Sequence, residues 1–538
     1  MRAAVRVSAI AGAAVLCGLA AFGTAAWLSG SDKPEHKEQS RVSATTGFAG
    51  LVPAPVRAQA APGVTWTLTP DARIATAPGS AAAARTGEIL AALLRPATGY
   101  PLPVAPYDPA AAPAGIALLL DAAGAEAGEL GAEGYRLDVT AAGVTVRAAQ
   151  PAGLSRGIQT LRQLLPAEIE SAQRVDAAWT VPGGSVTDRP RYEYRGMSLD
   201  LARHYFTPAE ARRFVDHLAR YKYNVLHLHL TDDQGWRIEI DGRPELTAIG
   251  ASTQVGGGPG GFWTQDDLRA VTAYAAERHI TVVPEIDMPG HTNAAIVAYP
   301  ELGCDDRKYE PYTGIEVGFS SLCVESEATY AFLDEVIGQI AALTPGPYLH
   351  IGGDEALTLS AERYKVFMDR AQTIVEKHGK RVMAWHQLAG AAPVPGAVLE
   401  YWNQGKEDAD IVAAAARAGA KVVLAPADHT YLDMAYAAGE RLGLKWAGTV
   451  DVKQSYTWEP ATHLPGLPEE SVLGVEAALW GETLTSVADA EYLVFPRLLS
   501  VAETAWSPRE AKDWPSFEAR ITEQHPRWDR AGIGYAKR

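Results

Sequence analysis

The chain has 538 residues, which is more than one small domain needs and leaves room for a barrel of about 250 to 350 residues with an accessory domain. Its composition, with 47% hydrophobic and 21% charged residues, is that of an ordinary globular protein with a sizeable core. The 48 basic and 64 acidic residues give a formal net charge of −16 without any run of Lys or Arg, which argues against a nucleic acid as partner.

The amino terminus, residues 1–30, has the pattern of a targeting segment. Arg2 and Arg6 precede a stretch without charges over 7–28, and a polar segment follows. Positive residues ahead of an apolar core are typical of an export signal, so we expect a secreted, extracellular protein. The uncharged stretch is also long enough to span a bilayer, so a retained membrane anchor with the rest of the chain outside is the alternative.

Two segments with different patterns follow. Residues 31–61 are polar and then rich in Ala, Pro and Gly without a sustained period, which is typical of a linker. Within 62–190, apolar and polar residues alternate on both sides of Ala142-Gly143, which predicts a β-hairpin, and apolar residues recur at helical spacing over 153–165. We expect a small α+β domain without evident chemistry.

From residue 191 to about 508, strand and helix signals alternate. Helices lie between most strand candidates, for example 208–222 after the N-cap Thr207 and 265–278 after Thr264. This alternation predicts an α/β fold, a (β/α)8 TIM barrel, followed by a C-terminal helical segment over 509–538. The strand candidates are 196–201, 224–230, 280–285, 348–351, 381–385, 397–402, 421–424 and 472–479.

The segment 350–355, His-Ile-Gly-Gly-Asp-Glu, places two adjacent carboxylates after a buried strand. Side chains on a strand alternate faces, so Asp354 and Glu355 can address one site only after the strand has ended, and the two glycines supply the turn. Reacting groups in such barrels sit at the carboxyl ends of the strands, where a close carboxyl pair can divide acid work from electrostatic stabilisation. The chain is therefore predicted to be an enzyme.

Aromatic and polar side chains end several other predicted strands. Trp385, Trp402 and Trp480 end the fifth, sixth and eighth strands. Aromatic faces cover the C–H surface of a pyranose, while Asp, Glu and Arg bind its hydroxyls, so the set predicts a carbohydrate pocket. The longest connections, 231–262 and 286–324, should help to build it.

Four motifs make this prediction specific: Leu-Thr-Asp-Asp-Gln-Gly-Trp at 230–236, Pro-Glu-Ile-Asp-Met-Pro-Gly-His at 284–291, the segment 350–355, and the pair Arg195 and Arg203. Together they resemble family 20 glycoside hydrolases, the β-N-acetylhexosaminidases. Gly-Phe-Ser-Ser-Leu-Cys at 318–323 is similar to secreted actinobacterial members. The resemblance covers about residues 130–508 and implies both the barrel and the preceding α+β domain.

The resemblance implies a retaining mechanism in which the substrate's own 2-acetamido group is the nucleophile and forms an oxazolinium ion. Glu355 would protonate the leaving oxygen and later activate water. Asp354 would accept the acetamido N–H and balance the positive charge, and Tyr431 would donate to the acetamido oxygen. The implied substrates are chitooligosaccharides or glycoconjugates with a terminal N-acetylglucosamine or N-acetylgalactosamine, with no cofactor or metal.

Matched positions also imply how the sugar is held. Arg203, Asp433 and Glu482 would bind sugar hydroxyls. The acetamido methyl and the ring would be enclosed by Trp385, Trp402 and Trp480, and Trp446 would form part of the next subsite. Without touching the sugar, His291 and Asp232 would tune Glu355. The chain departs from the family pattern at Leu228, often Trp, and after Trp385, where His386-Gln387 stands in place of a frequent acidic residue.

Several residues have two interpretations. With Cys17 set aside, Cys304 and Cys323 form an even pair, for which a disulfide is expected in an exported chain and two reduced buried thiols are the alternative.

His227 and His229 share a strand face, but without a clear third ligand we expect hydrogen-bonded histidines rather than a metal site. Asp287 is equally a site residue or an ion-pair partner. We expect packing roles for Trp236, Trp458 and Trp506.

Two other functions fit parts of the pattern. A non-catalytic sugar-binding protein would have no use for the positioned acid. A family 18 chitinase also uses the acetamido group, but its Asp-x-x-Asp-x-Asp-x-Glu spacing does not occur at the end of the fourth strand. The sequence leaves open gluco or galacto preference, the natural substrate, the oligomeric state and cleavage of the leader.

Overall fold

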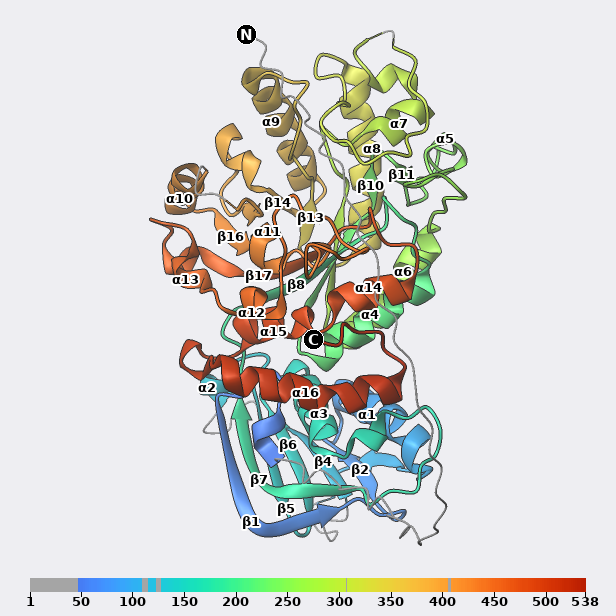
Figure 1. Cartoon of the computed structure of the whole chain (residues 1–538). Coiled ribbons are helices and arrows are strands. Elements are labelled where there is room, and N and C mark those ends of the chain that lie inside the picture. Colours follow the sequence, from blue (N-terminus) through green and yellow to red (C-terminus); the bar gives the residue numbers. More distant parts are fainter. Residues whose placement is uncertain (1–46, 109–114, 122–126, 306, 405–407) are drawn as a thin grey trace, which may run out of the picture. The chain divides into compact units, whose positions relative to one another are not determined.

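A computed structural model describes residues 47–538 apart from 109–114, 122–126, 306 and 405–407 (Figure 1). The predicted targeting segment and the linker up to residue 46 lie outside the described residues. In the part of the chain that the structure describes, no helix is both long and apolar enough to cross a membrane. The alternative of an anchor, which rests on residues 7–28, stays a prediction.

Eight parallel strands close into a barrel in the order β12-β13-β14-β15-β16-β17-β8-β9, which confirms the predicted (β/α)8 fold (Figure 1). Three of them have the predicted bounds, and the ends of the other five differ from the prediction by at most two residues. The strands read as nearly continuous apolar runs because both faces of a parallel barrel are covered. They are β8 (Tyr194–Asp200), β9 (Val225–His229), β12 (Thr281–Glu285), β13 (Tyr348–His350), β14 (Arg381–Trp385), β15 (Val398–Tyr401), β16 (Lys421–Leu424) and β17 (Val472–Leu479).

Two helices of the barrel begin at the caps that the sequence predicts. Thr207 caps α4 (Pro208–Arg220) and Thr264 caps α6 (Gln265–Ala276). In both, the threonine hydroxyl accepts a hydrogen bond from the third helical N–H, and the acidic side chain of that third residue accepts one from the threonine amide. These reciprocal bonds satisfy backbone donors that a helix start would leave free.

Both helices end earlier than predicted because a residue with a left-handed backbone follows each of them. Lys222 has φ of 66° and His279 has φ of 55°, so neither can continue an α-helix. The remaining helices of the barrel and the C-terminal segment are α5 (Glu245–Ala248), α7 (Asn293–Ala298), α8 (Glu327–Leu343), α9 (Ala361–Lys377), α10 (Ala409–Arg417), α11 (Ala427–Thr430), α12 (Val452–Tyr456), α13 (Pro460–His463), α14 (Val487–Val494), α15 (Arg497–Trp506) and α16 (Trp514–Ala531).

A seven-stranded sheet in the order β1-β7-β5-β6-β4-β2-β3 precedes the barrel. The predicted hairpin is present: β5 (Tyr135–Thr140) pairs antiparallel with β6 (Gly143–Ala148). The predicted helix is α3 (Pro151–Leu164), which shares a hydrophobic core with α1 (Ala81–Thr98) and the sheet. The other strands are β1 (Arg57–Thr67), β2 (Arg73–Thr76), β3 (Val104–Pro106), β4 (Gly115–Leu120) and β7 (Thr180–Asp188).

The linker prediction for 31–61 is wrong over its described part. Residues Gly47–Gly50 form a 3-10 turn, Leu51 and Val52 are buried, and β1 begins at Arg57. Most side chains of β1 are exposed on both faces, so the strand lacks the alternation that reveals a strand in a sequence. Its backbone pairing with β7 defines it instead.

A buried carboxylate, Asp188 at the end of β7, joins the sheet to the barrel. Its oxygens accept hydrogen bonds from Lys222 Nζ at 2.8 Å, Tyr135 Oη at 2.9 Å and Trp506 Nε1 at 3.0 Å. Asp188 and Lys222 are almost inaccessible to solvent. This paired buried charge is therefore one of the contacts that attach the sheet domain to the end of α4 and to α15.

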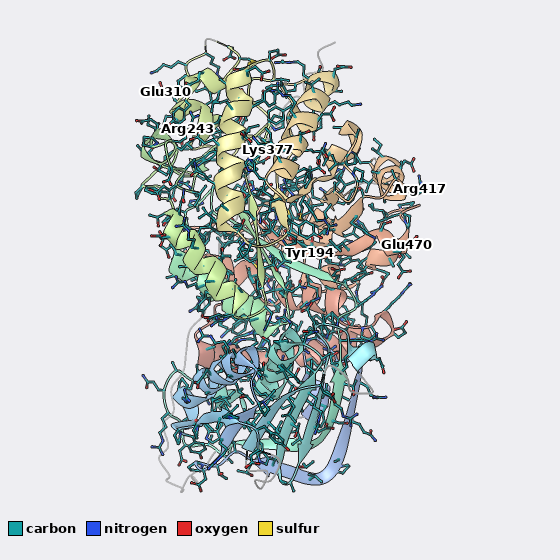
Figure 2. The ribbon with its side chains drawn as sticks, turned by 180° about the vertical axis from the view of Figure 1, so that it is seen from behind. Tyr194, Arg243, Glu310, Lys377, Arg417 and Glu470 are labelled. Carbon is teal, nitrogen blue, oxygen red and sulfur yellow. A yellow bond between two sulfur atoms is a disulfide. The ribbon has the colours of Figure 1, made fainter. Side chains whose placement is uncertain are left out.

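Side chains fill the interior of both domains (Figure 2). Tyr194, at the start of β8, lies among the barrel strands, whereas Lys377 lies at the surface beside Asp334. Trp236 and Trp458 are buried, and their indole N–H groups donate to backbone carbonyls. Like Trp506, they have the packing environment expected from the sequence.

We expect Asp188→Asn to lower the free energy of unfolding by about 3 kcal/mol or more, because the buried Lys222 ammonium would lose the one counter-charge that the described residues place at hydrogen-bond distance. Urea denaturation followed by tryptophan fluorescence measures this change. Asp266→Asn, in an exposed pair with Arg269, is the matched control and should change stability little. Equal losses in the two variants would contradict the assignment.

Candidate active site

The turn after β13 brings Asp354 and Glu355 to the carboxyl end of the barrel. Gly352 and Gly353 have φ of 60° and 105°, which glycine adopts readily. A Cβ on Gly352 would lie 1.6 Å from Asp287 Oδ1, and the Gly353 amide donates to that same oxygen at 3.2 Å. Asp287 therefore lies in the site and fixes the turn, and only glycine fits at position 352.

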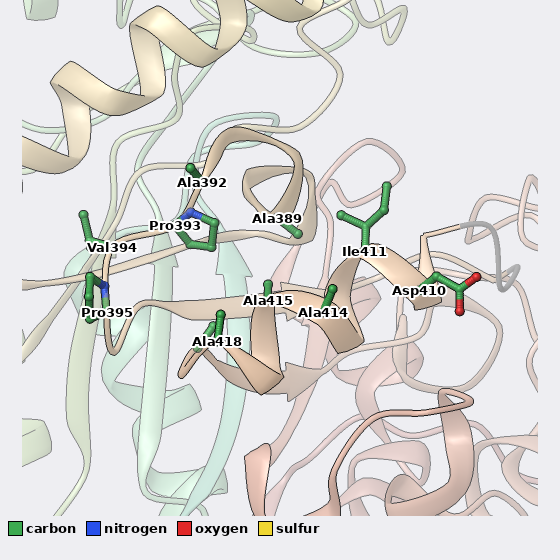
Figure 3. A pocket seen from close by; sticks show the side chains of 11 residues that line it. Ala389, Ala392, Pro393, Val394, Pro395, Asp410, Ile411, Ala414, Ala415 and Ala418 are labelled. Carbon is green, nitrogen blue, oxygen red and sulfur yellow. The ribbon is translucent and has the colours of Figure 1, made fainter.

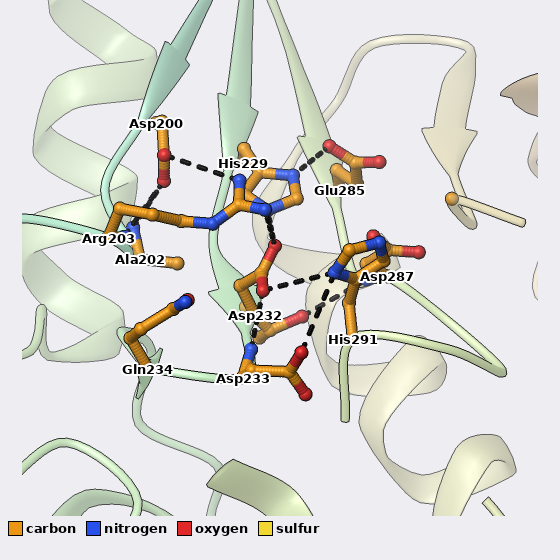
Figure 4. A network of polar contacts seen from close by, with 12 residues as sticks. Asp200, Ala202, Arg203, His229, Asp232, Asp233, Gln234, Glu285, Asp287 and His291 are labelled. Atoms are coloured by element: carbon orange, nitrogen blue, oxygen red, sulfur yellow. Dashed lines mark hydrogen bonds and ion pairs between the residues drawn. The ribbon is translucent and has the colours of Figure 1, made fainter. Parts of the chain in front are cut away.

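His291, in the loop after β12, contacts Asp232 with one ring nitrogen (Figure 4) and faces both carboxylates with the other. Its Nε2 lies 3.4 Å from Glu355 Oε2 and 3.7 Å from Asp354 Oδ2, while its Nδ1 lies 3.2 Å from Asp232 Oδ1. His291 and Glu355 have φ of 54° and 45°, a strained region for residues other than glycine. Such strain concentrates at functional sites. Four of the predicted site residues thus meet here.

Arg203 connects the charged residues around Asp232 with the aromatic side of the site. Its guanidinium lies 2.8 Å from Asp232 Oδ2 and 3.4 Å from Asp200 Oδ2. It also lies over the Trp480 ring, 4.9 Å from the centroid, a distance at which a cation attracts an aromatic face. Asp200 in turn accepts the amide of Gly481 at 2.8 Å, which fixes the end of β17.

Aromatic rings form a continuous wall beside these charges. Trp480 lies 5.8 Å from Trp385 and 6.1 Å from Tyr431, measured between ring centroids. Trp446 contacts both Tyr431 and Trp402 edge-on at 5.9 Å and is 50% exposed, whereas Trp385 is fully buried. The wall therefore runs from a closed end at Trp385 to an open rim at Trp446.

Several buried polar atoms of these residues have no hydrogen-bond partner among the described residues, and further such atoms occur elsewhere in the chain, for example Gln159 Oε1 and Thr329 Oγ1. Leaving such an atom unpaired costs about 1 to 3 kcal/mol, so a cluster of them at one set of strand ends is what a polar ligand would relieve. Carboxylate oxygens beside aromatic faces suit a sugar, which presents hydroxyls at its edge and C–H groups on its faces. The atoms are Asp354 Oδ1, both carboxylate oxygens of Asp433, Glu482 Oε2, Arg203 Nε, Trp385 Nε1 and Trp402 Nε1.

Burial and neighbouring charges shift the pKa values of these groups. Burial raises the pKa of Asp354 to about 6; the His291 cation opposes this rise and the adjacent Glu355 carboxyl adds to it. Burial alone would lower the pKa of His291, but the carboxylates of Asp232 and Asp354 raise it well above its usual range. A charged imidazolium therefore lies beside a carboxyl that titrates near neutral pH.

Several residues that support the site carry no predicted role. Asp200 and Glu285 bind Arg203 and His229, and Asp233 accepts hydrogen bonds from the Asn293 amide at 2.9 Å and Ser320 Oγ at 2.5 Å. Asp233 thereby joins the loop after β9 to the loop after β12. In the sequence, these residues lie at or just after the ends of predicted strands and next to predicted site residues, and this position is the signal that indicates a supporting role.

The two barrel histidines are hydrogen bonded, as expected. His229 bonds Glu285 and Asp232, while His227 Nδ1 lies 2.8 Å from Glu476. His227, Glu285 and His350 bring donor atoms close enough for a metal ion. Those atoms already form ion pairs with one another, with His350 Nδ1 2.8 Å from Glu285, so internal pairing accounts for the arrangement.

The predicted disulfide between Cys304 and Cys323 is present and closes part of the long loop after β12. The loop is tied to the site by backbone and side-chain bonds: Leu322 donates to the Pro289 carbonyl at 2.9 Å, and Gln234 donates to the Gly314 carbonyl at 3.0 Å. The connections after β9 and β12, which were expected to help build the site, thus contact each other.

A separate hollow of about 530 Å³ lies between α10 and the segment after β14 (Figure 3). Its lining is mainly Ala, Pro and Val side chains together with Ile411, and Asp410 lies at one end. None of the predicted site residues lines it. The hollow is therefore distinct from the strand-end site.

Comparison with known proteins agrees with this geometry. Residues 192–365 and 357–509 match the catalytic domain of glycosyl hydrolase family 20, and residues 49–189 match domain 2 of that family. The chain belongs to glycosyl hydrolase family 20. A β-N-acetylhexosaminidase from Cellulomonas fimi is 43% identical over 483 residues, which cover 90% of this chain and 95% of that protein.

Solved structures of this family are closely similar. A mutant of Streptomyces plicatus β-hexosaminidase in complex with its product GlcNAc has 50% identity and a TM-score of 0.88, and the match covers 92% of this chain and 97% of that one. The family 20 β-N-acetylhexosaminidase from Streptomyces coelicolor has 49% identity and the same TM-score over 92% and 98% of the chains. This family 20 member is therefore a glycoside hydrolase of the β-hexosaminidase type.

We expect Gly352→Ala to abolish most activity, because its Cβ would push Asp287 away from the turn that carries Asp354 and Glu355. Gly379→Ala is the matched control, since Gly379 also has a positive φ but open space around it. The left-handed backbone alone costs about 1 to 2 kcal/mol for alanine, and both variants bear that cost. Comparable kcat/KM values for the two purified variants would contradict the steric argument.

Proposed function

We propose that this family 20 hydrolase is a retaining exo-β-N-acetylhexosaminidase. It removes terminal N-acetylglucosamine or N-acetylgalactosamine from the non-reducing end of chitooligosaccharides or glycoconjugates. The observation that carries the proposal is the adjacent pair Asp354 and Glu355, which faces His291 beside a tryptophan wall with unpaired buried polar atoms. The GlcNAc product in the related Streptomyces plicatus structure supports this class of substrate.

Glu355 is the general acid and then the general base. In the first step the substrate's acetamido oxygen attacks the anomeric carbon, the glycosidic bond breaks, and Glu355 gives its proton to the departing oxygen. In the second step water attacks the anomeric carbon, Glu355 takes the water's proton, and the oxazolinium ring opens. Two inversions retain the configuration, and no bond forms between sugar and protein.

Asp354 and Tyr431 act on the acetamido group. The Asp354 side chain is 13% exposed against 32% for Glu355, so it is the deeper of the two, and its Oδ1 is free to accept the acetamido N–H. Burial raises the pKa of Tyr431 well above its usual value, so the phenol keeps its proton and can donate to the acetamido oxygen. The pair stabilises the charge that develops as the oxazolinium forms.

The remaining pocket residues recognise the sugar. Arg203, Asp433 and Glu482 bind its hydroxyls through the polar atoms that lack a protein partner. Trp385, Trp402 and Trp480 enclose the acetamido methyl and the ring. The exposed Trp446 at the rim stacks on the next sugar residue. His386, where the family often has an acidic residue, supports this wall with its ring 5.7 Å from Trp402.

We also propose that the protein is exported. Arg2 and Arg6 ahead of an uncharged stretch support an export signal, and the disulfide between Cys304 and Cys323 suits an oxidising compartment. Assays of hexosaminidase activity in medium, membranes and cytosol of the expressing cell test this. Activity confined to the cytosol would overturn export, and activity in the membrane fraction would favour the anchored form.

We expect Glu355→Gln to lower turnover of substrates with poor leaving groups by about 10² to 10⁴, and to spare activated aryl glycosides, which leave without a proton. Asp354→Asn should impair both substrate classes, because oxazolinium formation itself suffers. Steady-state kinetics with an aryl N-acetyl-β-glucosaminide and with chitobiose separates the roles. Glucosides without the acetamide are the control and should not react. Equal losses on both substrates for Glu355→Gln would remove it from the acid role.

The mechanism also predicts a pH dependence. Asp354 must be ionised to balance the oxazolinium charge and has a pKa of about 6, so kcat/KM should fall as the pH drops through about 6. His291→Gln removes the cation that lowers this pKa, so the acid limb should move to higher pH. Profiles of kcat/KM between about pH 4 and 8 measure both enzymes. An acid limb at the same pH in the two would contradict the assignment.

A further inference from the structure

His229, at the end of β9, contacts three residues of the site but has no part in the proposed mechanism or in the proposed binding of the sugar. The ring is buried, its Nδ1 contacts Glu285 Oε2, and its Nε2 lies 2.9 Å from Asp232 Oδ2 (Figure 4). Its ring edge meets Trp480, 4.9 Å between centroids at 81°. It therefore lies between the carboxylate that binds His291 and the tryptophan beneath Arg203.

Both ring nitrogens of His229 face carboxylate oxygens. A neutral imidazole has one N–H and one lone pair, so one of the two carboxylates would meet a lone pair; only the imidazolium donates to both. Burial lowers the pKa of His229, but Glu285 and Asp232 outweigh it and raise the pKa to about 10. The ring is therefore a fixed cation at the pH of catalysis.

Charges alternate in sign along one row of contacts that starts at Glu285. The anion Glu285 holds the cation His229, which holds the anion Asp232. Asp232 holds the cation His291 at 3.2 Å, and His291 faces Glu355 at 3.4 Å. The register of the barrel sets the first contact, because Glu285 on β12 pairs directly with His229 on β9.

The two carboxylate oxygens of Asp232 contact different groups: one faces the acid–base residues and the other faces the sugar-binding wall. Oδ1 bonds His291, which serves the acid–base pair, and Oδ2 bonds both His229 and Arg203, at 2.9 and 2.8 Å. Without His229, Oδ2 keeps only Arg203 among the described residues, and the Asp233 amide, which donates to Oδ1 at 2.6 Å, is then the other contact that orients the carboxylate toward His291. Asp200 and Asp287, on neighbouring strand ends, are further acidic side chains near this ring, and burial together with the Asp354 carboxyl raises the pKa of Asp287 well above its usual range.

We propose that His229, held by Glu285, is a positioning residue that couples the acid–base side of the site to its sugar-binding wall through Asp232 and Trp480. This inference rests on the proposed function, since it assigns His229 to the reaction of Glu355 and to the binding by Arg203. His229 touches neither the sugar nor the reacting atoms. Its effect reaches them only through its two neighbours.

The test is the kinetics of His229→Gln with an aryl N-acetyl-β-glucosaminide. The amide keeps one donor but has no charge, so kcat should fall and KM should rise together, with a loss in kcat/KM of about 10- to 100-fold. Tyr194→Phe is the matched control, because Tyr194 is also buried in the barrel and hydrogen bonds Glu476 at the far end of the same polar cluster. It should leave kcat and KM near the wild-type values.

A double-mutant cycle shows whether His229 acts through Asp232. Asp232→Asn together with His229→Gln should be hardly slower than Asp232→Asn alone, because the second change removes a link that is already broken. Losses that multiply would overturn the proposal. So would a His229→Gln variant that loses kcat at unchanged KM, which is the result of a smaller folded fraction.

Glu285→Gln keeps the inference testable if His229→Gln does not fold, as judged by circular dichroism. The His229 ring then stays in place but loses the carboxylate that keeps it charged, and the same joint change in kcat and KM is expected. Wild-type constants for this variant would overturn the inference. A wild-type enzyme without activity on the N-acetyl substrate would instead overturn the proposed function, so the two failures are distinct.

Discussion

Charges buried at the carboxyl end of the barrel must be paired, and the rest of the site depends on this constraint. An uncompensated buried charge costs several kcal/mol, so each ion in the row is tolerated only while its neighbour stays in place. Arg203, Asp232 and His291 come from three different strand ends, yet none can move alone. The site is therefore held in place by paired charges, which suits the charged intermediate of the proposed mechanism.

The same constraint explains how two adjacent carboxyls in the chain become chemically different. Asp354 and Glu355 follow each other on one turn, but Asp354 lies deeper and has its pKa raised to about 6 by burial. Glu355 lies nearer the mouth, where a leaving group and a water molecule can reach it. The division of labour proposed for the two acids thus rests on their different depth and not on residue type alone.

The sequence predicts the elements well where a physical pattern is local. The barrel strands are short apolar runs, and the threonine caps stand directly before their helices. Strand β1 was not predicted because its side chains are exposed on both faces, and the ends of α4 and α6 depend on left-handed residues that no period marks. The supporting roles of Glu285 and His229 were not assigned because the two residues are 56 positions apart, and only the barrel register brings them together.

The left-handed backbone at His291 and Glu355 has one more consequence. Each such residue costs on the order of 1 to 3 kcal/mol, which the surrounding fold has to absorb. Glycine at position 355 would relax the chain at a side chain that is partly exposed, so selection for stability and selection for turnover act in opposite directions there. Glycine at position 291 would also leave the buried Asp232 without one of its partners, so it would bring no such gain. In a lineage that no longer cleaves its sugar, position 355 is therefore where a stabilising substitution is expected, and the outcome would be a more stable protein that binds sugar without cleaving it.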